Sequence, residues 1–256
     1  MPGATDEASW PGHAGDFDAD AAGRLTPSTG VPVTTDRSSP GGLAVVWAEE
    51  NARDSLFDAL RRRETYSTSG TRIVVRFFGG WSYDAAICSD VALARLGYEG
   101  GVPMGGELTA RPTGAGAPRL VVSALRDDLG APLQRVQIVK GWFDGGTTHE
   151  TVYEVAGDAA LGAVDLATCA PDGAGFGALC EVWTDPDFDP TQPAFYYARV
   201  LEVPTCRWSR ALCNAEHVDC ATLPADAPLR ACCDGSIPDT VQERAWTSPI
   251  WYLPPP

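Results

Sequence analysis

The chain has 256 residues, enough for one large domain or two small ones, and 34 acidic against 19 basic side chains give a net charge of -15. So negative a surface repels phosphate groups, which argues against nucleic acid and anionic membranes as partners. No apolar run approaches the ~20 residues that a membrane-spanning helix needs, so we expect no membrane span.

Residues 1–42 are rich in Gly, Pro, Asp, Ser and Thr and follow no lasting hydrophobic period, which predicts loop structure. The first twenty residues lack the basic stretch and the apolar run of a signal peptide. They contain His13 among acidic residues that include Asp16 and Asp18. Neighbouring carboxylates suit a histidine to metal or proton chemistry, although a solvated surface residue is the more common outcome.

Residues 43–70 change character and predict a strand followed by a helix. The run LAVVWA is short and continuously apolar, as in a strand buried on both faces. After it, Ala52, Leu56, Ala59 and Leu60 recur with a helical period, with acidic residues before them and arginines after them. A buried strand that leads into a helix is one unit of a parallel α/β fold, and one such unit alone cannot cover both of its faces.

From Thr71 onward the sequence predicts about seven strands and no convincing helix between them, which favours an antiparallel β-sandwich. In the run 195–202, odd-numbered and even-numbered residues are expected to face opposite sides of a sheet. The predicted strands are RIVVRFFGGW, RLVVSALRD, RVQIVKGWF, ETVYEVAGD, ALCEVWTD, AFYYARVLEV and AWTSPIWY.

Eight cysteines occur, five of them in a loop-like insert at about residues 206–233. Their spacing favours disulfides over free thiols or zinc, because structural zinc sites use close Cys-x2-4-Cys pairs. We expect at least two disulfides and therefore a periplasmic or secreted protein. Cys169 and Cys180 bracket a glycine-rich loop and are one candidate pair. A bridge from Cys206 or Cys213 to Cys220, Cys232 or Cys233 would join the two ends of the insert. Cys88 has no obvious partner in the sequence.

Other motifs carry only weak signals for chemistry. DFDAD at 16–20 and DPDFDP at 185–190 have alternate carboxylates but lack the glycine and glutamate of a calcium loop, so solvated acidic turns are favoured. RRRETYSTSG offers arginines and hydroxyls that suit an anion, but a charged helix end explains it equally well. His149 is expected in an exposed turn, and His217 in the solvated cysteine-rich insert.

Several segments together resemble the C-terminal part of the family called Domain of Unknown Function 3604. The resemblance runs in order along nearly the whole chain. It rests on PGATDEASWPGH, GGLAVVWAEENARDSLFDALRRRETYSTSGTRIVVRFFGGW, GVPMGG, RVQIVKGW, VWTDPDFDP, FYYARVLEVPTCRW and QERAWTSPIWY. Full-length family members resemble the PHP phosphoesterases, which are metal-dependent hydrolases on a distorted (β/α) barrel. The Asp-x-His-x-His and Asp-x-His motifs that would bind metal in the family precede the matching region, and this sequence has neither.

The resemblance implies a mainly β fold, with an antiparallel β-sandwich-like domain at 71–256 preceded by a remnant β-α unit of an incomplete barrel at 1–70. It implies that the chain is the C-terminal fragment of a metal-dependent, phosphoesterase-like hydrolase and is inactive alone. The full-length parent is expected to use Zn or Mn, and the partner of this chain is expected to be the missing N-terminal barrel portion of that parent. No cofactor is expected in this chain, and a small-molecule ester is the expected substrate class. Because loops at that end of a barrel line the active site, His13, Glu49, Arg53 and Tyr66 are substrate-side candidates. His13, Asp16 and Asp18 are weak metal candidates. The competing hypothesis is a stand-alone extracytoplasmic β-sandwich module for binding.

Overall fold

The computed structural model describes residues 21–25, 41–170 and 173–255, and strands dominate these ranges. Its elements are α1 (Ala21–Leu25), β1 (Leu43–Val46), α2 (Arg53–Arg61), β2 (Thr65–Thr68), β3 (Val74–Gly80), η3 (Ala85–Ser89), α3 (Leu93–Gly100), β4 (Gly101–Pro103), β5 (Arg119–Leu125), β6 (Leu133–Asp144), β7 (Thr147–Gly157), β8 (Ala178–Thr184), β9 (Ala194–Glu202), β10 (Thr205–Cys206), α4 (Trp208–Ala215), η4 (Arg230–Cys232), β11 (Thr240–Val241), β12 (Arg244–Thr247) and β13 (Ile250–Tyr252).

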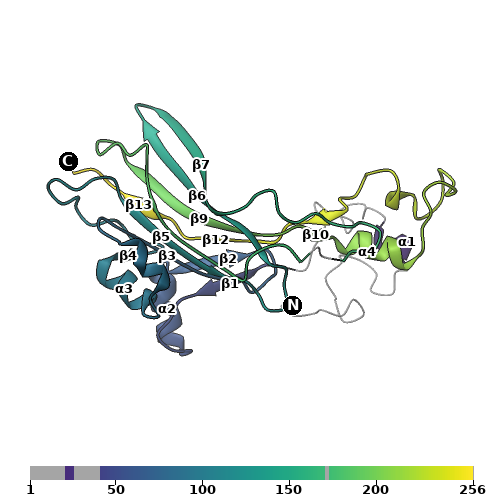
Figure 1. The fold of residues 1–256 in the computed structure, drawn as a ribbon, viewed down its shortest axis with the longest axis horizontal. Coiled ribbons are helices and arrows are strands. Elements are labelled where there is room, and N and C mark those ends of the chain that lie inside the picture. The colour runs from purple at the N-terminus through teal and green to yellow at the C-terminus, as the bar shows by residue number, and fades with distance from the viewer. Residues whose placement is uncertain (1–20, 26–40, 171–172, 256) are drawn as a thin grey trace.

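Two antiparallel sheets form the body of the molecule (Figure 1). The larger sheet has seven strands in the order β1-β2-β12-β9-β6-β7, with β13 also paired to β9, and the smaller has the order β4-β3-β5-β8. A separate two-stranded sheet, β10-β11, lies toward the end of the molecule that carries α4. The predicted mainly β, antiparallel fold is therefore confirmed, and neither large sheet closes into a barrel.

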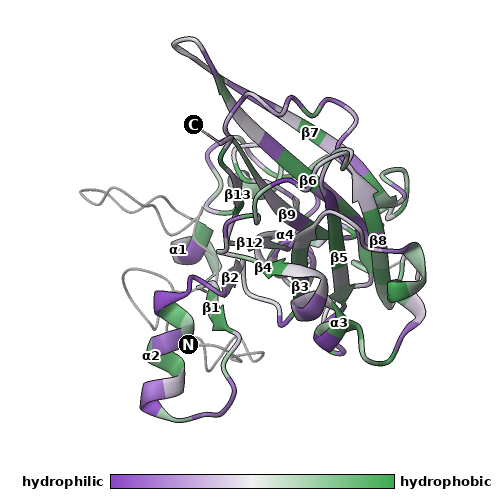
Figure 2. Cartoon of the chain, turned by 90° about the vertical axis from the view of Figure 1, so that its left-hand side faces the viewer, coloured by the Kyte–Doolittle hydropathy of each residue, from purple (hydrophilic) through white to green (hydrophobic). Residues whose placement is uncertain are grey.

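Side chains from the two sheets meet in one apolar core, which makes the arrangement sandwich-like. Along β9, Tyr196, Ala198 and Val200 are fully buried while the alternate residues Phe195 and Tyr197 are partly exposed, as the two-residue period predicts. Figure 2 shows hydrophobic segments along the strands in the body of the molecule. The core includes Tyr66, Ile73, Val75, Phe77, Leu120, Val122, Leu133, Val136, Ile138, Ile250 and Tyr252.

A helical layer covers the outer face of the smaller sheet, and the expectation of no helix after residue 71 was wrong. Helix α3 and the 3-10 helix η3 pack there against a second buried cluster that includes Phe78. Gly97 and Gly100 lower the helix propensity of this segment, so the pattern did not indicate a helix. Close packing forms it, because a Cβ on Gly97 would lie 2.5 Å from Phe78 Cδ2.

The segment at 43–68 contains the predicted strand and helix, but the strand differs from its prediction. β1 lies at the edge of the larger sheet, pairs antiparallel with β2 and is only partly buried, so burial on both faces was wrong. The apolar sequence of β1 therefore reflects packing against one side, where Val45 and Trp47 contact the core. On α2, Ala59 is buried whereas Leu60 is exposed.

Four disulfides join all eight cysteines: Cys88–Cys180, Cys169–Cys206, Cys213–Cys232 and Cys220–Cys233. The expectation of at least two bridges is confirmed, as is a bridge within the insert. The candidate pair of Cys169 and Cys180 was wrong, because Cys180 lies in β8 and bonds to η3 while Cys169 bonds to β10. Four disulfides indicate an oxidising environment. Within the described ranges no helix is long and apolar enough to span a bilayer.

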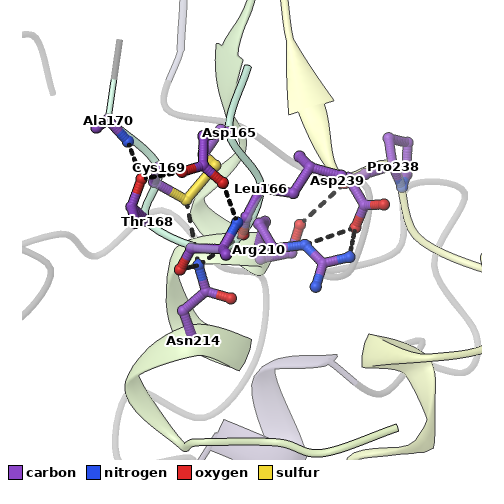
Figure 3. The surroundings of a disulfide bond; sticks show 12 residues. Asp165, Leu166, Thr168, Cys169, Ala170, Arg210, Asn214, Pro238 and Asp239 are labelled. Carbon is purple, nitrogen blue, oxygen red and sulfur yellow. Dashed lines mark hydrogen bonds and ion pairs between the residues drawn. A yellow bond between two sulfur atoms is a disulfide. The ribbon is translucent and has the colours of Figure 1, made fainter.

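The cysteine-rich insert has a small core of its own that includes Cys213, Cys232 and Leu25 of α1. It is tied to the loop before β8 at its base (Figure 3), where Asn214 Nδ2 donates to the Leu166 carbonyl at 2.9 Å. The insert is therefore a satellite of the sandwich rather than part of its core.

Candidate functional site

A polar hollow of about 620 Å³ lies at the connection between β1 and α2 and is called the Glu64 hollow here. Its walls come from the connection between β1 and β2, from β3 and β4 of the smaller sheet and from α3, so residues far apart in sequence meet in it. It is lined by Trp47, Ala48, Glu49, Arg62, Glu64, Arg76, Tyr98 and Pro103. Four of these side chains carry charge, and they carry it in equal numbers of each sign.

The end of α2 positions Glu64. Arg63 adopts a left-handed backbone conformation (φ 59°), which stops the helix and starts β2 two residues later. The Arg63 Nε donates to the Gly105 carbonyl at 3.0 Å, so this turn is fixed against the loop after β4. As a result the Glu64 side chain occupies a buried position, and the whole residue is only 3% exposed.

Three donors surround the Glu64 carboxylate. Arg62 Nη2 donates to it at 3.4 Å, Arg76 Nη1 lies 3.9 Å away, and the Tyr98 hydroxyl donates to it in a short hydrogen bond. Arg76 Nη1 also donates to the Tyr98 oxygen at 3.1 Å. The pKa of Tyr98 is raised, first by burial and then by the hydrogen bond and charge of Glu64, against a lowering effect of Arg76. Tyr98 is therefore held in its protonated, donating form.

Trp47 orients Arg76 across the gap between the sheets. The guanidinium carbon of Arg76 lies 3.3 Å from the ring centroid of Trp47, and Trp47 Nε1 donates to the Val75 carbonyl at 2.9 Å. A guanidinium carries five N–H donors in a planar fork, and the contacts of Arg62 and Arg76 given above occupy only some of them. The remaining donors suit a planar or tetrahedral oxyanion.

The structure separates the residues that the sequence proposed for the site. Glu49 is exposed and lines the Glu64 hollow, whereas Arg53 is exposed on α2 and does not line it. Tyr66 does not line the hollow but lies in the core, where its hydroxyl donates to the Ile73 carbonyl at 3.1 Å and its pKa is raised, mainly by burial. His13, Asp16 and Asp18 lie outside the described residues.

Sequence reasoning did not single out Glu64, Arg76 or Tyr98 as site residues, and it included Arg62 only among the arginines of RRRETYSTSG. The stretch RRRETYSTSG was noted for a possible anion, but its glutamate was not, and Arg76 and Tyr98 stand 12 and 34 residues beyond Glu64. The only available signal was a glutamate placed between an arginine run and a strand. No sequence pattern indicates that residues of β3 and α3 contact this glutamate in the folded chain.

The acidic motif at 185–190 contains a turn with an exposed Asp187, as was favoured, but its first carboxylate is not solvated. Asp185 is buried and lies 2.7 Å from the Nζ of Lys140, which is also buried and is the only lysine of the chain. The Tyr196 hydroxyl donates to the same carboxylate oxygen at 2.7 Å, and the Tyr153 hydroxyl donates to Asp187 at 2.7 Å. The motif therefore joins the two sheets through a buried ion pair.

The two histidines within the described ranges are both exposed, as expected. His217 has a left-handed backbone (φ 52°) in the insert. His149 is part of β7 rather than a turn, and its ring stacks on that of Trp142 at a centroid distance of 5.1 Å. In the described part of the chain no group of three or more His, Cys, Asp or Glu side chains is placed to hold a metal ion.

Comparison with known proteins gives one match. A family model described as Protein of unknown function (DUF3604) matches residues 1–254. No curated protein and no solved structure matches the chain.

Proposed function

Because the chain belongs to the DUF3604 family of proteins of unknown function, we propose that it is the C-terminal part of a metal-dependent, phosphoesterase-like hydrolase that acts on small esters. In this proposal the Glu64 hollow forms the substrate-side wall of the active site and recognises the anionic group of the ester. The metal ligands come from segments outside the described residues, and the chain alone has no hydrolase activity.

The observation that carries this proposal is the pair of arginines held over one buried carboxylate in the Glu64 hollow. Glu64 and the ring of Trp47 fix Arg76, so an oxyanion meets an arginine that is already oriented. Arg62 is half exposed, and its contact with Glu64 at 3.4 Å is made by a flexible side chain, so it can turn toward a ligand. Bidentate recognition of a phosphate or sulfate oxygen pair is the task for which a guanidinium is suited.

The described residues do not fit a catalytic metal site, since no cluster of three ligands occurs among them. When bound elsewhere in the parent, a divalent metal would supply an activated water for attack on the ester. The side chains of this chain bind and orient the ester. Tyr98, held protonated, donates its one hydroxyl hydrogen to Glu64 and accepts from Arg76, so it helps to position these two groups.

The test compares the chain with the longest natural open reading frame that contains it. Both proteins are assayed with manganese or zinc against a panel of phosphate, carbamate and sulfate esters. We expect turnover by the longer protein only. Hydrolysis by the chain alone at a comparable rate, or no turnover of any ester by the longer protein, would contradict the proposal.

Arginine variants of the longer protein then test the hollow itself. Arg62→Ala is expected to raise KM about tenfold with little change in kcat, because it removes binding that the ground state and the transition state share. Arg95→Ala is the matched control, since Arg95 is exposed on α3 and its ion-pair partner among the described residues is Glu99, one helical turn away. An equal effect of both variants, or no effect of the first, would remove the hollow from the active site.

A second function, a β-sandwich binding module, is favoured by a separate aromatic pocket on the larger sheet. For either function we propose a periplasmic or secreted location. Its support is the set of four disulfides, which form and persist in oxidising compartments.

A further inference from the structure

A second pocket, of about 490 Å³, lies on the larger sheet near the tip of the β6–β7 hairpin and is called the aromatic pocket here. Three of its lining side chains are large, apolar and widely exposed: Phe143 (48%), Trp251 (40%) and Leu253 (53%). It is lined by Gly141, Trp142, Phe143, Thr148, His149, Glu150, Pro193, Ala194, Phe195, Trp251 and Leu253.

The strand register builds this pocket as one row across four strands. Trp251 of β13 pairs with Phe195 of β9, which pairs with Gly141 of β6, which pairs with Glu150 of β7. Side chains of directly paired residues share one face of a sheet. Along the row there are therefore two aromatic rings, then a glycine without a side chain, and then a carboxylate.

Gly141 makes the row concave. A Cβ at this position would lie 2.2 Å from Cζ of Phe195, so the phenyl ring rests directly against the backbone of β6. The rings of Phe195 and Trp251 are 5.3 Å apart at 49° and form an angled wall. Trp142 and His149 are the next pair along β6 and β7, and their rings stack on each other on the opposite face, where Trp142 packs against the core.

The charge in the aromatic pocket has one sign. Glu150 is its only carboxylate, and no lysine or arginine is among the described residues that line it. Within the described ranges the Glu150 carboxylate makes no hydrogen bond or ion pair, so it is available to a ligand. The net charge of -15 of the whole chain adds to the attraction for cations.

From these observations we propose that the aromatic pocket binds a small organic cation of the quaternary ammonium type. Such a cation packs its methyl groups on ring faces and is attracted by their electron density, with Trp the strongest partner. The Glu150 carboxylate balances the charge of a head group that cannot donate a classical hydrogen bond. A neutral sugar would need several directed polar partners, whereas the polar side chains of this pocket are only Thr148, His149 and Glu150. The proposal is independent of the hydrolase function.

The test uses choline and 3,3-dimethylbutan-1-ol, which has nearly the same shape but a carbon in place of the charged nitrogen. Binding to the purified chain is measured by calorimetry and by the indole N–H signals of the tryptophans. We expect choline to bind saturably, to bind at least about tenfold more tightly than the neutral compound, and to weaken as salt is raised. Equal binding of the two compounds, or no saturable binding of choline, would overturn the proposal.

Variants locate the site. Trp251→Ala and Glu150→Gln are each expected to weaken choline binding about fivefold or more, by removing a ring face or the counter-charge. Phe57→Ala and Glu216→Gln are the matched controls, because both residues are exposed, on α2 and after α4 respectively. Glu150→Gln changes one exposed surface charge and leaves the fold intact, so unchanged binding by this variant would place any choline site elsewhere.

Discussion

Glu202, the last residue of β9, gives the protein a pH-dependent stability. Its side chain is buried, with the residue 1% exposed, and its Oε1 has no hydrogen-bond partner within the described ranges. Burial raises the pKa of its carboxyl from 4.5 to about 7, helped by the charges of Glu243 and Asp127 and opposed by the Thr71 hydroxyl and the Ala131 amide.

The raised pKa means that the folded state holds a proton that the unfolded state releases. The stability associated with this proton is fully present below about pH 4.5 and is lost as the pH rises through about 7. Because the pKa of Glu202 rises from 4.5 to about 7, the free energy of unfolding falls by about 3 kcal/mol between pH 4.5 and pH 8. Glu202→Gln keeps the shape of the side chain and cannot ionise.

We therefore expect Glu202→Gln to be more stable than the natural chain by up to about 3 kcal/mol at pH 8, and nearly equal to it at pH 4.5. The measurement is urea unfolding followed by tryptophan fluorescence at several pH values, with the disulfides intact. Glu216→Gln, at an exposed position, is the control and should show no such pH dependence. A Glu202→Gln variant that gains nothing between pH 4.5 and 8 would refute the reasoning.

Three further predictions concern the buried ion pair, a disulfide and the glycine of the aromatic pocket. Lys140→Ala should lower the free energy of unfolding in urea by about 3–5 kcal/mol, because it leaves the buried Asp185 carboxylate without its partner. The double variant Lys140→Met with Asp185→Leu should lower it much less, and equal losses would show that the charges are not the cause. Replacing Cys88 and Cys180 by Ala should lower the free energy of unfolding by about 4–5 kcal/mol at most in the chain-entropy account. The natural chain alkylated without reductant should show no free thiols by mass spectrometry, and eight alkylated cysteines would contradict the disulfides. Gly141→Val should destabilise by about 1–3 kcal/mol in thermal unfolding, since its side chain collides with the ring packed over it, and a neutral outcome would argue against that contact.

The strands were predictable because their signal is local. Alternation along β9 and the β-branched runs of β3 and β5 are properties of neighbouring residues, and the structure has strands at each place. Helix α3 was not predictable for the opposite reason. Its glycines disfavour a helix locally, and only the fit of Gly97 against Phe78 makes it the stable form.

The sites depend on contacts between distant segments, so sequence revealed them only in part. Glu49 was placed near the candidate site by resemblance and does line the Glu64 hollow. The partners Arg76 and Tyr98 come from β3 and α3, and no periodicity reports which residues meet across two sheets. Disulfide pairing failed in the same way, because Cys88 and Cys180 are 92 residues apart and are brought together by the packing of η3 on β8.

The short pairing of β10 with β11 has a consequence for how this protein tolerates change. Thr205 pairs with Val241 and Cys206 with Thr240, so the chain leaves the sandwich and returns to it at nearly the same point. The segment between these strands is therefore joined to the sandwich at a single place. It has two internal disulfides and a small apolar core of its own. Segments attached in this way can lengthen, shorten or be exchanged over evolution while the register of the main sheets stays the same.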